Sequence, residues 1–187
     1  LGDAVEAWQD DIAALPDGRA IILANEFFDA LPIRQFVRRG DAWRERAVAD
    51  GAFVEIAAED PPSLPGGAPE GAIQEVSDAS RAVAFALAQR VAAQGGAFLT
   101  LDYGPAERGF GDSLQAMRAH GYADPLAAPG TVDLTAHVDF SALAEAGRAG
   151  GAAVHGPLPQ GLFLQRLGLA QRASMLARTA PARAGDF

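Results

Sequence analysis

Hydrophobic positions near the start of the chain recur at helical spacing and then give way to a strand. Steps of four, three, four and three separate the apolar residues Leu1, Val5, Trp8, Ile12 and Leu15. That spacing predicts one apolar face of a helix over residues 1–15, which Pro16 stops. Residues 19–24, RAIILA, form a short apolar run typical of a buried strand, and the preceding helix favours parallel pairing.

The next segment alternates in the manner of antiparallel strands. Residues 33–48 predict two strands around a Gly40-Asp41 turn, with arginines on the solvent side. Residues 53–57 predict a third strand. Residues 60–71, DPPSLPGGAPEG, are dense in proline and glycine and predict an exposed loop.

A helix and a second apolar run follow. Asp78 or Ser80 caps a helix that carries Val83, Leu87 and Val91, and Gly95 with Gly96 ends it. The run GAFLTLDYG, residues 96–104, predicts a second buried strand. The order of strand, helix and strand predicts part of a doubly wound α/β sheet.

The remainder of the chain alternates irregular and helical patterns. Residues 105–138 carry glycine and proline throughout and show no clear period. Asp139 or Ser141 starts a short helix that runs to Gly147, and residues 152–156, AAVHG, predict a strand. Residues 161–177 predict one or two amphipathic helical pieces.

Composition narrows the classes of function. The net charge of −9 argues against a nonspecific binder of nucleic acid or anionic membrane, because phosphate contacts need clustered cations. All fifteen basic residues are arginine, which excludes Schiff-base chemistry on lysine. Cysteine is absent, which excludes disulfides, and no apolar run approaches the ~20 residues of a membrane span. At 187 residues, one domain is the default expectation.

Polar residues at the exit of the first predicted strand are the main candidates for a site. Asn25, Glu26 and Asp29 follow it directly, with Phe27 and Phe28 able to shield them from water. A carboxylate there can grip a planar guanidinium through two parallel hydrogen bonds. The alternative is that Asn25 and Asp29 cap the turn while both phenylalanines enter the core. The residues alone leave these two interpretations even.

Three other candidates are weaker. Asp102-Tyr103-Gly104 begins like a nucleotide-binding turn, but the glycines that should follow are absent, although Asp102 and Tyr103 can still lie at the carboxyl edge of the sheet. A metal site would draw on His120, Asp133, His137 and Asp139; no helical ligand pair appears, and Asp139 suits a helix cap better. The serines lack the surroundings of a hydrolase nucleophile.

An ordered series of motifs resembles a known family. The series comprises ANEFFDALPIRQFV (24–37), EVS (75–77), LDYG (101–104), SLQAMRAH (113–120), PGTVDLTAHVDFSAL (129–143) and GPLPQGLFLQRLGL (156–169). It is similar to the MidA-type family of S-adenosylmethionine (SAM)-dependent methyltransferases over residues 3–178. A mitochondrial member of that family is a complex I assembly factor that methylates an arginine of a complex I subunit.

The resemblance implies a class I, Rossmann-like methyltransferase fold of the α/β class. It implies a mostly parallel sheet with flanking helices and an inserted hairpin and loop over residues 33–75. Residues 1–187 would supply the second half of one methyltransferase domain. The family's glycine-rich SAM turn and its ribose-binding acid would lie upstream of Leu1, so the cofactor-binding half would be absent from this chain.

The resemblance also implies roles for residues near the first strand. Glu26 and Asp29 would be catalytic, since arginine methyltransferases of other families place carboxylates beside the transferring methyl. Asn25 and Phe27 would contact SAM. The remaining expected contacts are with the substrate and come from Phe28, Asp102, Tyr103 and His137. No metal is needed.

The implied partner is a protein substrate, such as a complex I subunit, in the bacterial cytoplasm or the mitochondrial matrix. The arginine hairpin is interpreted as a solvated face. Two rival interpretations remain: a non-catalytic assembly module that binds a client through the hairpin and the 60–71 loop, and a metal hydrolase around His120 and His137.

Overall fold

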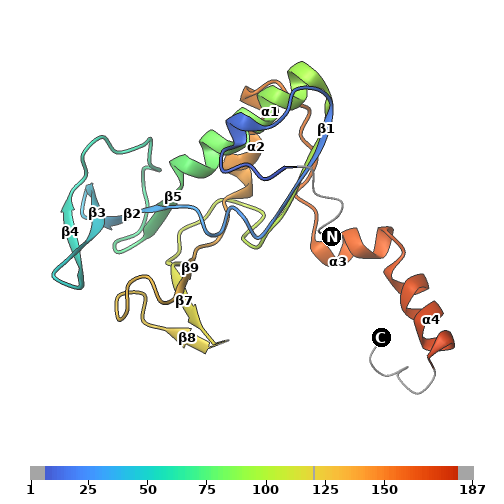
Figure 1. Ribbon diagram of the computed structural model, residues 1–187. Helices are drawn as coiled ribbons and strands as arrows, with labels where there is room; N and C mark the ends of the chain where they lie inside the picture. Colours follow the sequence, from blue (N-terminus) through green and yellow to red (C-terminus); the bar gives the residue numbers. More distant parts are fainter. Residues whose placement is uncertain (1–6, 120, 181–187) are drawn as a thin grey trace. The chain divides into compact units, whose positions relative to one another are not determined.

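A computed structural model describes residues 7–119 and 121–180 and divides the chain into two units, Leu1–Val154 and His155–Phe187. The second unit holds α3 (Gln160–Arg166) and α4 (Leu169–Thr179), which confirms the helical prediction for that segment. Figure 1 shows the elements of the first unit, which are η2 (Ile12–Ala14), β1 (Ala20–Asn25), β2 (Arg34–Arg39), β3 (Ala42–Ala49), β4 (Ala52–Ala57), β5 (Ile73–Val76), α1 (Asp78–Gln94), β6 (Gly96–Leu101), β7 (Gln115–Arg118), β8 (Gly121–Ala123), β9 (Asp133–Thr135) and α2 (Phe140–Ala149).

The two predicted apolar strands pair in parallel, with α1 as the connection between them. β1 and β6 run in register from Ala20 opposite Gly96 to Asn25 opposite Leu101. The strand, helix and strand order is therefore confirmed. The helix cap differs from the prediction: Ser77, not Asp78 or Ser80, accepts the Ser80 N–H at 3.1 Å and begins α1.

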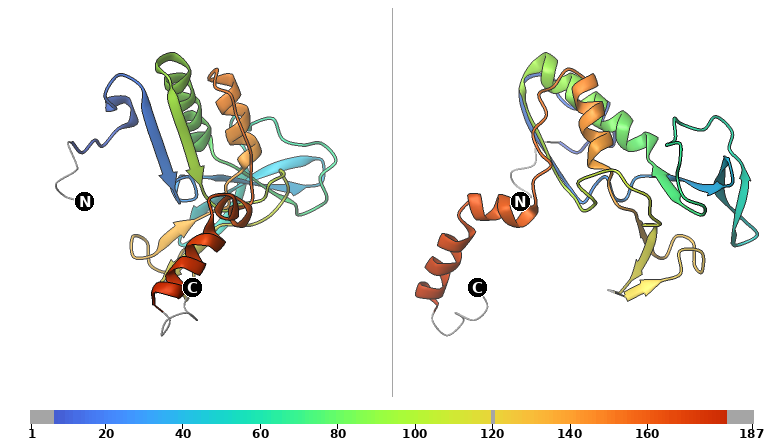
Figure 2. Two further views of the ribbon diagram at one scale, coloured as in Figure 1. Left: turned by 90° about the vertical axis from the view of Figure 1, so that its right-hand side faces the viewer. Right: turned by 180° about the vertical axis from the view of Figure 1, so that it is seen from behind.

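The core of the first unit lies between this parallel pair and two helices. Figure 2 shows α1 and α2 side by side on one face of β1 and β6. Phe28, Ala84, Val138 and Leu143 are buried together, with Phe98 of β6 packed against them. The core therefore joins the turn after β1 to both helices, and it fixes the carboxyl end of the parallel strands.

The other face of β1 is apolar but exposed in the described part of the chain. Ile21 is 82% exposed and Leu23 is 68% exposed, whereas Ile22 between them points toward the helices and is half-buried. Parallel strands in α/β proteins are apolar because both faces are covered. The prediction of a buried strand thus holds for one face of β1.

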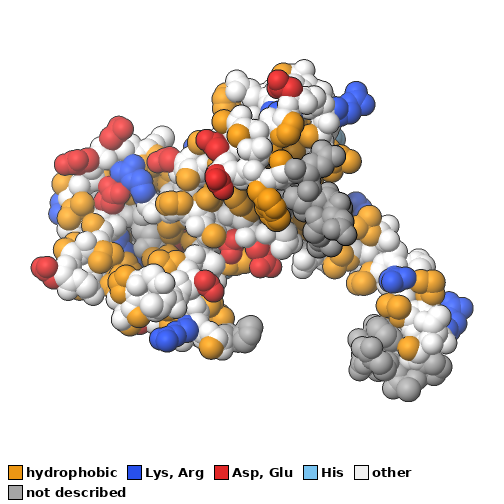
Figure 3. All heavy atoms as spheres, viewed as in Figure 1, with side chains coloured by type: hydrophobic (Ala, Val, Ile, Leu, Met, Phe, Trp, Pro, Cys, Tyr) orange, Lys and Arg blue, Asp and Glu red, His pale blue; other side chains and the backbone are white. Residues whose placement is uncertain are grey.

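The arginine-rich segment forms a four-stranded antiparallel sheet in the order β4-β3-β2-β5. This confirms the predicted strands around Gly40-Asp41 and at 53–57, and β5 adds an edge that was not predicted. Figure 3 shows acidic and basic side chains intermingled over this sheet. Arg38 departs from the solvent-side prediction: its side chain is only 14% exposed, and the guanidinium lies over the Trp43 ring at 5.8 Å.

Two other predictions differ from the structure. Within the described residues, the N-terminal helix is reduced to the short turn η2; Leu1 and Val5 lie outside them. Helices depend on tertiary packing of their apolar face, and Trp8 is 86% exposed. Residues 152–156 were predicted as a strand. They have no regular structure, and none of the described strands lies beside them as a hydrogen-bonding partner.

The segment 105–138 is also more regular than expected. Residues 115–135 contribute a three-stranded antiparallel sheet in the order β8-β7-β9. Its strands have three or four residues each, too short to give a recognisable alternation. This small sheet supplies one wall of the candidate site.

Candidate active site at the ends of the parallel strands

The turn after β1 is anchored to the end of β6. The Glu26 N–H donates to the Leu101 carbonyl at 2.9 Å, so the two strands end side by side. Glu26 then adopts φ of 46°, in the left-handed region. Non-glycine residues held there are uncommon and concentrate at functional sites.

Asp102 holds this turn in place. Its Oδ2 accepts the N–H groups of Phe27 at 3.2 Å and Phe28 at 2.9 Å, and its Oδ1 accepts the Tyr103 N–H at 3.0 Å. Burial raises the pKa of Asp102, and the hydrogen bonds from Tyr103 and Phe28 oppose that rise. Both oxygens accept backbone N–H groups, so Asp102 fastens the turn after β1 to the end of β6; its substrate contact stays a prediction.

Tyr103 and Asp29 form a buried polar pair. The Tyr103 hydroxyl donates to Asp29 Oδ2 at 2.5 Å. Asp29 is 5% exposed, and its Oδ1 is buried without a hydrogen-bond partner among the described residues. Burial and the bond to Asp29 raise the pKa of Tyr103. The tyrosine therefore stays neutral and donates to one oxygen of Asp29, while the other oxygen keeps no described partner.

The segment before α2 connects the turn after β1 to the residues that follow β6. The Ala136 N–H donates to the Asp29 carbonyl at 2.9 Å, and the Val138 N–H donates to the Tyr103 carbonyl at 3.0 Å. The His137 ring meets the Tyr103 ring edge-on, with centroids 6.1 Å apart. Three segments far apart in the sequence, NEFFDALP, LDYG and DLTAHVDF, thus meet at one place.

Gly104 permits this close approach. A Cβ at Gly104 would lie 2.2 Å from the Val138 carbonyl oxygen. Any larger residue would push the Tyr103 loop away from residues 136–138.

The two phenylalanines of the turn differ in burial. Phe28 is 2% exposed and lies in the core, so its placement supports packing and does not offer a direct substrate contact. Phe27 is 40% exposed, and Asn25 and Glu26 beside it are exposed as well. These three side chains are therefore accessible at the carboxyl edge of the sheet, where ligands of open α/β sheets bind.

An open hollow lies beside the turn. Its lining comes from Glu26, Asp29, Ala30, Tyr103, Gln115, Met117, Tyr122, Val132, Asp133, Leu134 and Thr135. We refer to it as the acidic hollow, because among the described residues its lining has three carboxylates and no basic side chain. The sequence analysis missed Gln115 and Thr135, since the strands that carry them were not predicted.

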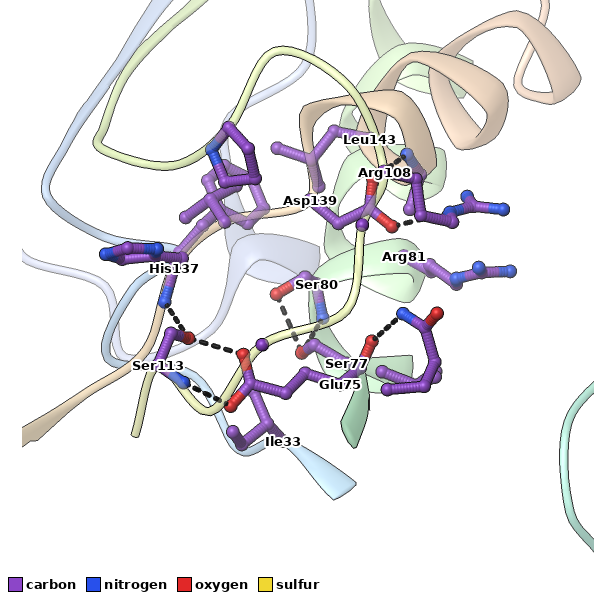
Figure 4. A pocket seen from close by; sticks show the side chains of 18 of the residues that line it. Ile33, Glu75, Ser77, Ser80, Arg81, Arg108, Ser113, His137, Asp139 and Leu143 are labelled. Carbon is purple, nitrogen blue, oxygen red and sulfur yellow. Dashed lines mark hydrogen bonds and ion pairs between the residues drawn. The ribbon is translucent and has the colours of Figure 1, made fainter. Parts of the chain in front are cut away.

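A more enclosed cavity of about 290 Å³ lies between β5, the 105–113 loop and the starts of α1 and α2. Figure 4 shows two of its polar contacts: Ser113 hydrogen-bonds Glu75, and Arg108 bonds Asp139 at 2.8 Å. Arg81 also lines this cavity, and its Nε is buried without a hydrogen-bond partner among the described residues. Ser113 accepts the backbone N–H of His137 and has no bond to its imidazole. The serine is therefore held as a structural link between β5 and the segment before α2.

The metal candidates within the described residues, Asp133, His137 and Asp139, form no cluster of ligands. His120 lies outside the described residues. No group of three or more potential ligands is found within residues 7–119 and 121–180. Asp139 caps α2 by accepting the Ala142 N–H at 2.9 Å, which confirms its predicted use as a helix cap.

Comparison with known proteins gives the family. A family model of S-adenosyl-L-methionine-dependent methyltransferases matches residues 1–158. The chain belongs to this methyltransferase family. It is also similar to a Burkholderia thailandensis protein solved bound to S-adenosyl-homocysteine, with 28% identity, a TM-score of 0.74, and coverage of 95% of this chain and 49% of that one.

Curated relatives of the chain carry a more specific name. The protein arginine methyltransferase NDUFAF7 of Rattus norvegicus is 37% identical over 184 residues, covering 91% of this chain and 40% of that protein. Its Danio rerio counterpart is 37% identical and covers 90% and 42%. The chain therefore spans less than half of the length of the curated relatives it matches.

The family resemblance and the α/β fold are thereby confirmed, as is SAM as the family's cofactor. The residues described here fit one side of such a cofactor, because Asn25, Glu26 and Phe27 are exposed together at the end of β1, opposite the end of β6. Their individual contacts remain predictions. No helix in the described part of the chain is both long and apolar enough to cross a membrane.

Proposed function

We propose that the protein containing this chain is a SAM-dependent arginine methyltransferase acting on a protein substrate. One observation carries the proposal: the turn after β1 presents the exposed Glu26 beside the buried Asp29, which keeps one carboxylate oxygen without a partner among the described residues. A guanidinium is planar and carries five N–H donors, so two neighbouring carboxylates match it well. The relatives named as arginine methyltransferases support this choice.

Glu26 would orient the attacking nitrogen. A guanidinium nitrogen must direct a lone pair at the methyl group, and a carboxylate that accepts its N–H holds it in that geometry. When bound, SAM would supply the methyl group from its sulfonium sulfur. Once the methyl group is transferred, the remaining molecule would be a neutral thioether. As the new N–C bond forms, the methylated nitrogen loses its proton to the Glu26 carboxylate, which balances the charge.

Asp29 and Tyr103 would hold the guanidinium from the other side. The Tyr103 hydroxyl fixes one oxygen of Asp29, so the carboxylate does not have to reorganise when the substrate arrives. Asp102 would keep the turn in place through its backbone hydrogen bonds. Asn25 and Phe27 are proposed to contact the cofactor. His137 would contact the substrate through its exposed ring.

We further propose a subunit of respiratory complex I as the substrate, and a role in assembly of that complex. This rests on the resemblance to MidA-type proteins. The corresponding locations are the bacterial cytoplasm or the mitochondrial matrix.

The experiment is methyl transfer with labelled SAM and full-length protein. A complex I subunit is compared with a version in which arginines are replaced by lysine, and mass spectrometry locates methylarginine. We expect Glu26→Gln to lower kcat about 100-fold or more. Glu107→Gln is the control, because Glu107 is an exposed carboxylate outside the acidic hollow.

Failure to label any arginine would overturn the proposed reaction. Full activity in Glu26→Gln would remove Glu26 from the mechanism while leaving the reaction intact.

A further inference from the structure

We propose that the enclosed cavity between β5, the 105–113 loop and the starts of α1 and α2 binds a small apolar carboxylate, with Arg81 of α1 holding its charged end. The lining of this cavity shares no residue with the acidic hollow, so the inference goes beyond the proposed function and does not rest on it. Arg81 belongs to none of the motifs that indicate the family.

The size and the walls of the cavity suit a small apolar body. Its volume is about 290 Å³, close to the lower end of the range for ligand pockets, which is roughly 300–1,000 Å³. The large apolar side chains of the wall come from segments far apart in the sequence and include Phe28, Ile33, Val76, Phe110, Val138 and Leu143. A pocket of this kind holds its ligand through apolar surface and orients it through a few polar groups.

The acidic groups of the wall already have donors within the protein. Glu75 accepts the Gln35 Nε2–H at 2.7 Å and the Ser113 N–H at 3.0 Å. Asp139 accepts the Arg108 Nε–H at 2.8 Å and also caps α2. Both carboxylates are therefore satisfied without a bound cation.

Arg81 differs from these groups, because its guanidinium makes no hydrogen bond and no ion pair among the described residues. Arg108, the other arginine of the wall, bonds Asp139 and also Glu145 at 3.2 Å. The Arg81 Nε is closed to solvent, so it is not the proposed contact. The residue as a whole is half-buried, and its open end lies at the terminal nitrogens, which are the proposed donors.

The charges around the cavity decide which kind of anion fits. Glu75 and Asp139 would repel a multiply charged phosphate, because like charges at close range are unfavourable. A carboxylate carries a single charge and matches one guanidinium through two parallel hydrogen bonds. Figure 4 shows Arg81 and Arg108 extending toward the same side of the cavity. A carboxylate on Arg81 would therefore lie on the side where Arg108 is held by its own carboxylates.

The starts of two helices add to this preference. α1 and α2 both begin at the cavity, and the partial positive charge of a helix N-terminus favours an anion nearby. The apolar wall requires an apolar body, and Arg81 requires an acceptor. A monocarboxylate with an apolar body meets both requirements.

The test is a binding titration of full-length protein saturated with S-adenosyl-homocysteine, so that the cofactor site is filled. The probes are benzoate, its neutral analogue benzamide, acetate and inorganic phosphate, and ligand-observed NMR gives the Kd of each. Benzoate should bind about tenfold more tightly than benzamide, because a charge-assisted pair with the guanidinium is lost in the amide. Acetate should bind more weakly than benzoate, because it lacks the apolar body.

Arg81→Gln should raise the Kd of benzoate about tenfold, to that of benzamide. Arg81→Lys should restore part of the affinity, because it keeps the charge and loses the planar fork. Arg148→Gln is the matched control, since Arg148 is an exposed arginine of α2 outside the wall of the cavity. Circular dichroism and an unchanged Kd for S-adenosyl-homocysteine confirm that the variants are folded.

Equal affinity for benzoate and benzamide, or equal affinity of the parent and Arg81→Gln for benzoate, would overturn the inference. Tighter binding of phosphate than of benzoate would overturn the choice of a carboxylate, and saturable binding of none of the probes would reject the site. Methyl transfer to a protein arginine is measured separately, so the proposed function stands or fails independently of these titrations.

Discussion

The hydroxyl of Tyr103 donates a 2.5 Å hydrogen bond to the buried carboxylate of Asp29, across 74 positions of the sequence. The two residues follow different strands, and they meet because β1 and β6 end at the same edge of the parallel pair. One oxygen of Asp29 is thereby fixed, and the other is buried without a hydrogen-bond partner among the described residues.

Replacing Tyr103 by phenylalanine should destabilise the protein. The change removes the donor and leaves both oxygens of Asp29 buried without a partner, which costs about 1–3 kcal/mol. Urea unfolding of full-length protein measures the loss. Tyr122→Phe is the control, because Tyr122 is 83% exposed and its hydroxyl makes no described bond; equal stabilities of the two variants would contradict the prediction.

The contribution of Asp102 to the free energy of unfolding should decrease as pH rises. Burial raises its pKa in the folded state above the unfolded value. The stability it contributes is therefore fully present below the unfolded pKa, near 3.8, and is lost as pH rises through the folded pKa. The difference in unfolding free energy between the parent and Asp102→Asn should be larger at pH 3.5 than at pH 7; a difference that grows with pH would refute this sign.

Glu45 should show the opposite dependence. Arg34 bonds both of its oxygens at 2.8 Å, and this hydrogen-bonded pair lowers the pKa of Glu45. Its contribution is present above the unfolded pKa near 4.5 and is lost as pH falls through the folded pKa. Glu45→Gln should therefore cost up to about 1 kcal/mol at pH 7 and less near pH 3. Glu59→Gln is the control at pH 7 and should leave the unfolding free energy unchanged, because Glu59 is an exposed residue whose carboxylate makes no described bond.

A methyl group at Gly104 should disrupt the site. The added Cβ would lie 2.2 Å from the Val138 carbonyl oxygen, so the Tyr103 loop must move, at a cost of about 3 kcal/mol. Methyl transfer should fall along with stability. Gly109→Ala is the control in the same loop, because a Cβ there meets nothing within 4 Å. Comparable melting temperatures for the two alanine variants would show that the loop adapts.

The chain of 187 residues should bind SAM far more weakly than full-length protein. It presents Asn25, Glu26 and Phe27 to one side of the cofactor, and the glycine turn and ribose-binding acid expected for the family are not among its motifs. Each lost charge-assisted hydrogen bond is worth about 1.5–3 kcal/mol, so the affinity should fall by orders of magnitude. Micromolar binding of SAM by residues 1–187 in isothermal titration would show that the cofactor site is misplaced.

The sequence predicted those elements whose formation depends mainly on residues close together in the chain. The apolar run of β1, the Gly40-Asp41 turn, the end of α1 at Gly95 and the cap at Asp139 were each predicted from neighbouring residues. Over residues 7–15, the described part of the N-terminal stripe, only a short 3-10 helix forms, because most of the stability of a helix comes from packing of its apolar face. The β7–β9 sheet was missed because its strands are short and pair with residues distant in sequence.

The sequence by itself determined the family and placed Asn25, Glu26 and Asp29 at the exit of a parallel strand. It left open whether these residues cap a turn or line a site, because that depends on which groups surround them. Only the tertiary structure decided that Asp102 binds the backbone of the turn, that Phe28 enters the core, and that Asp29 shares a hollow with Thr135. Hydrogen bonds and burial depend on distances between segments, and those distances are fixed only when β1, β6 and β9 come together.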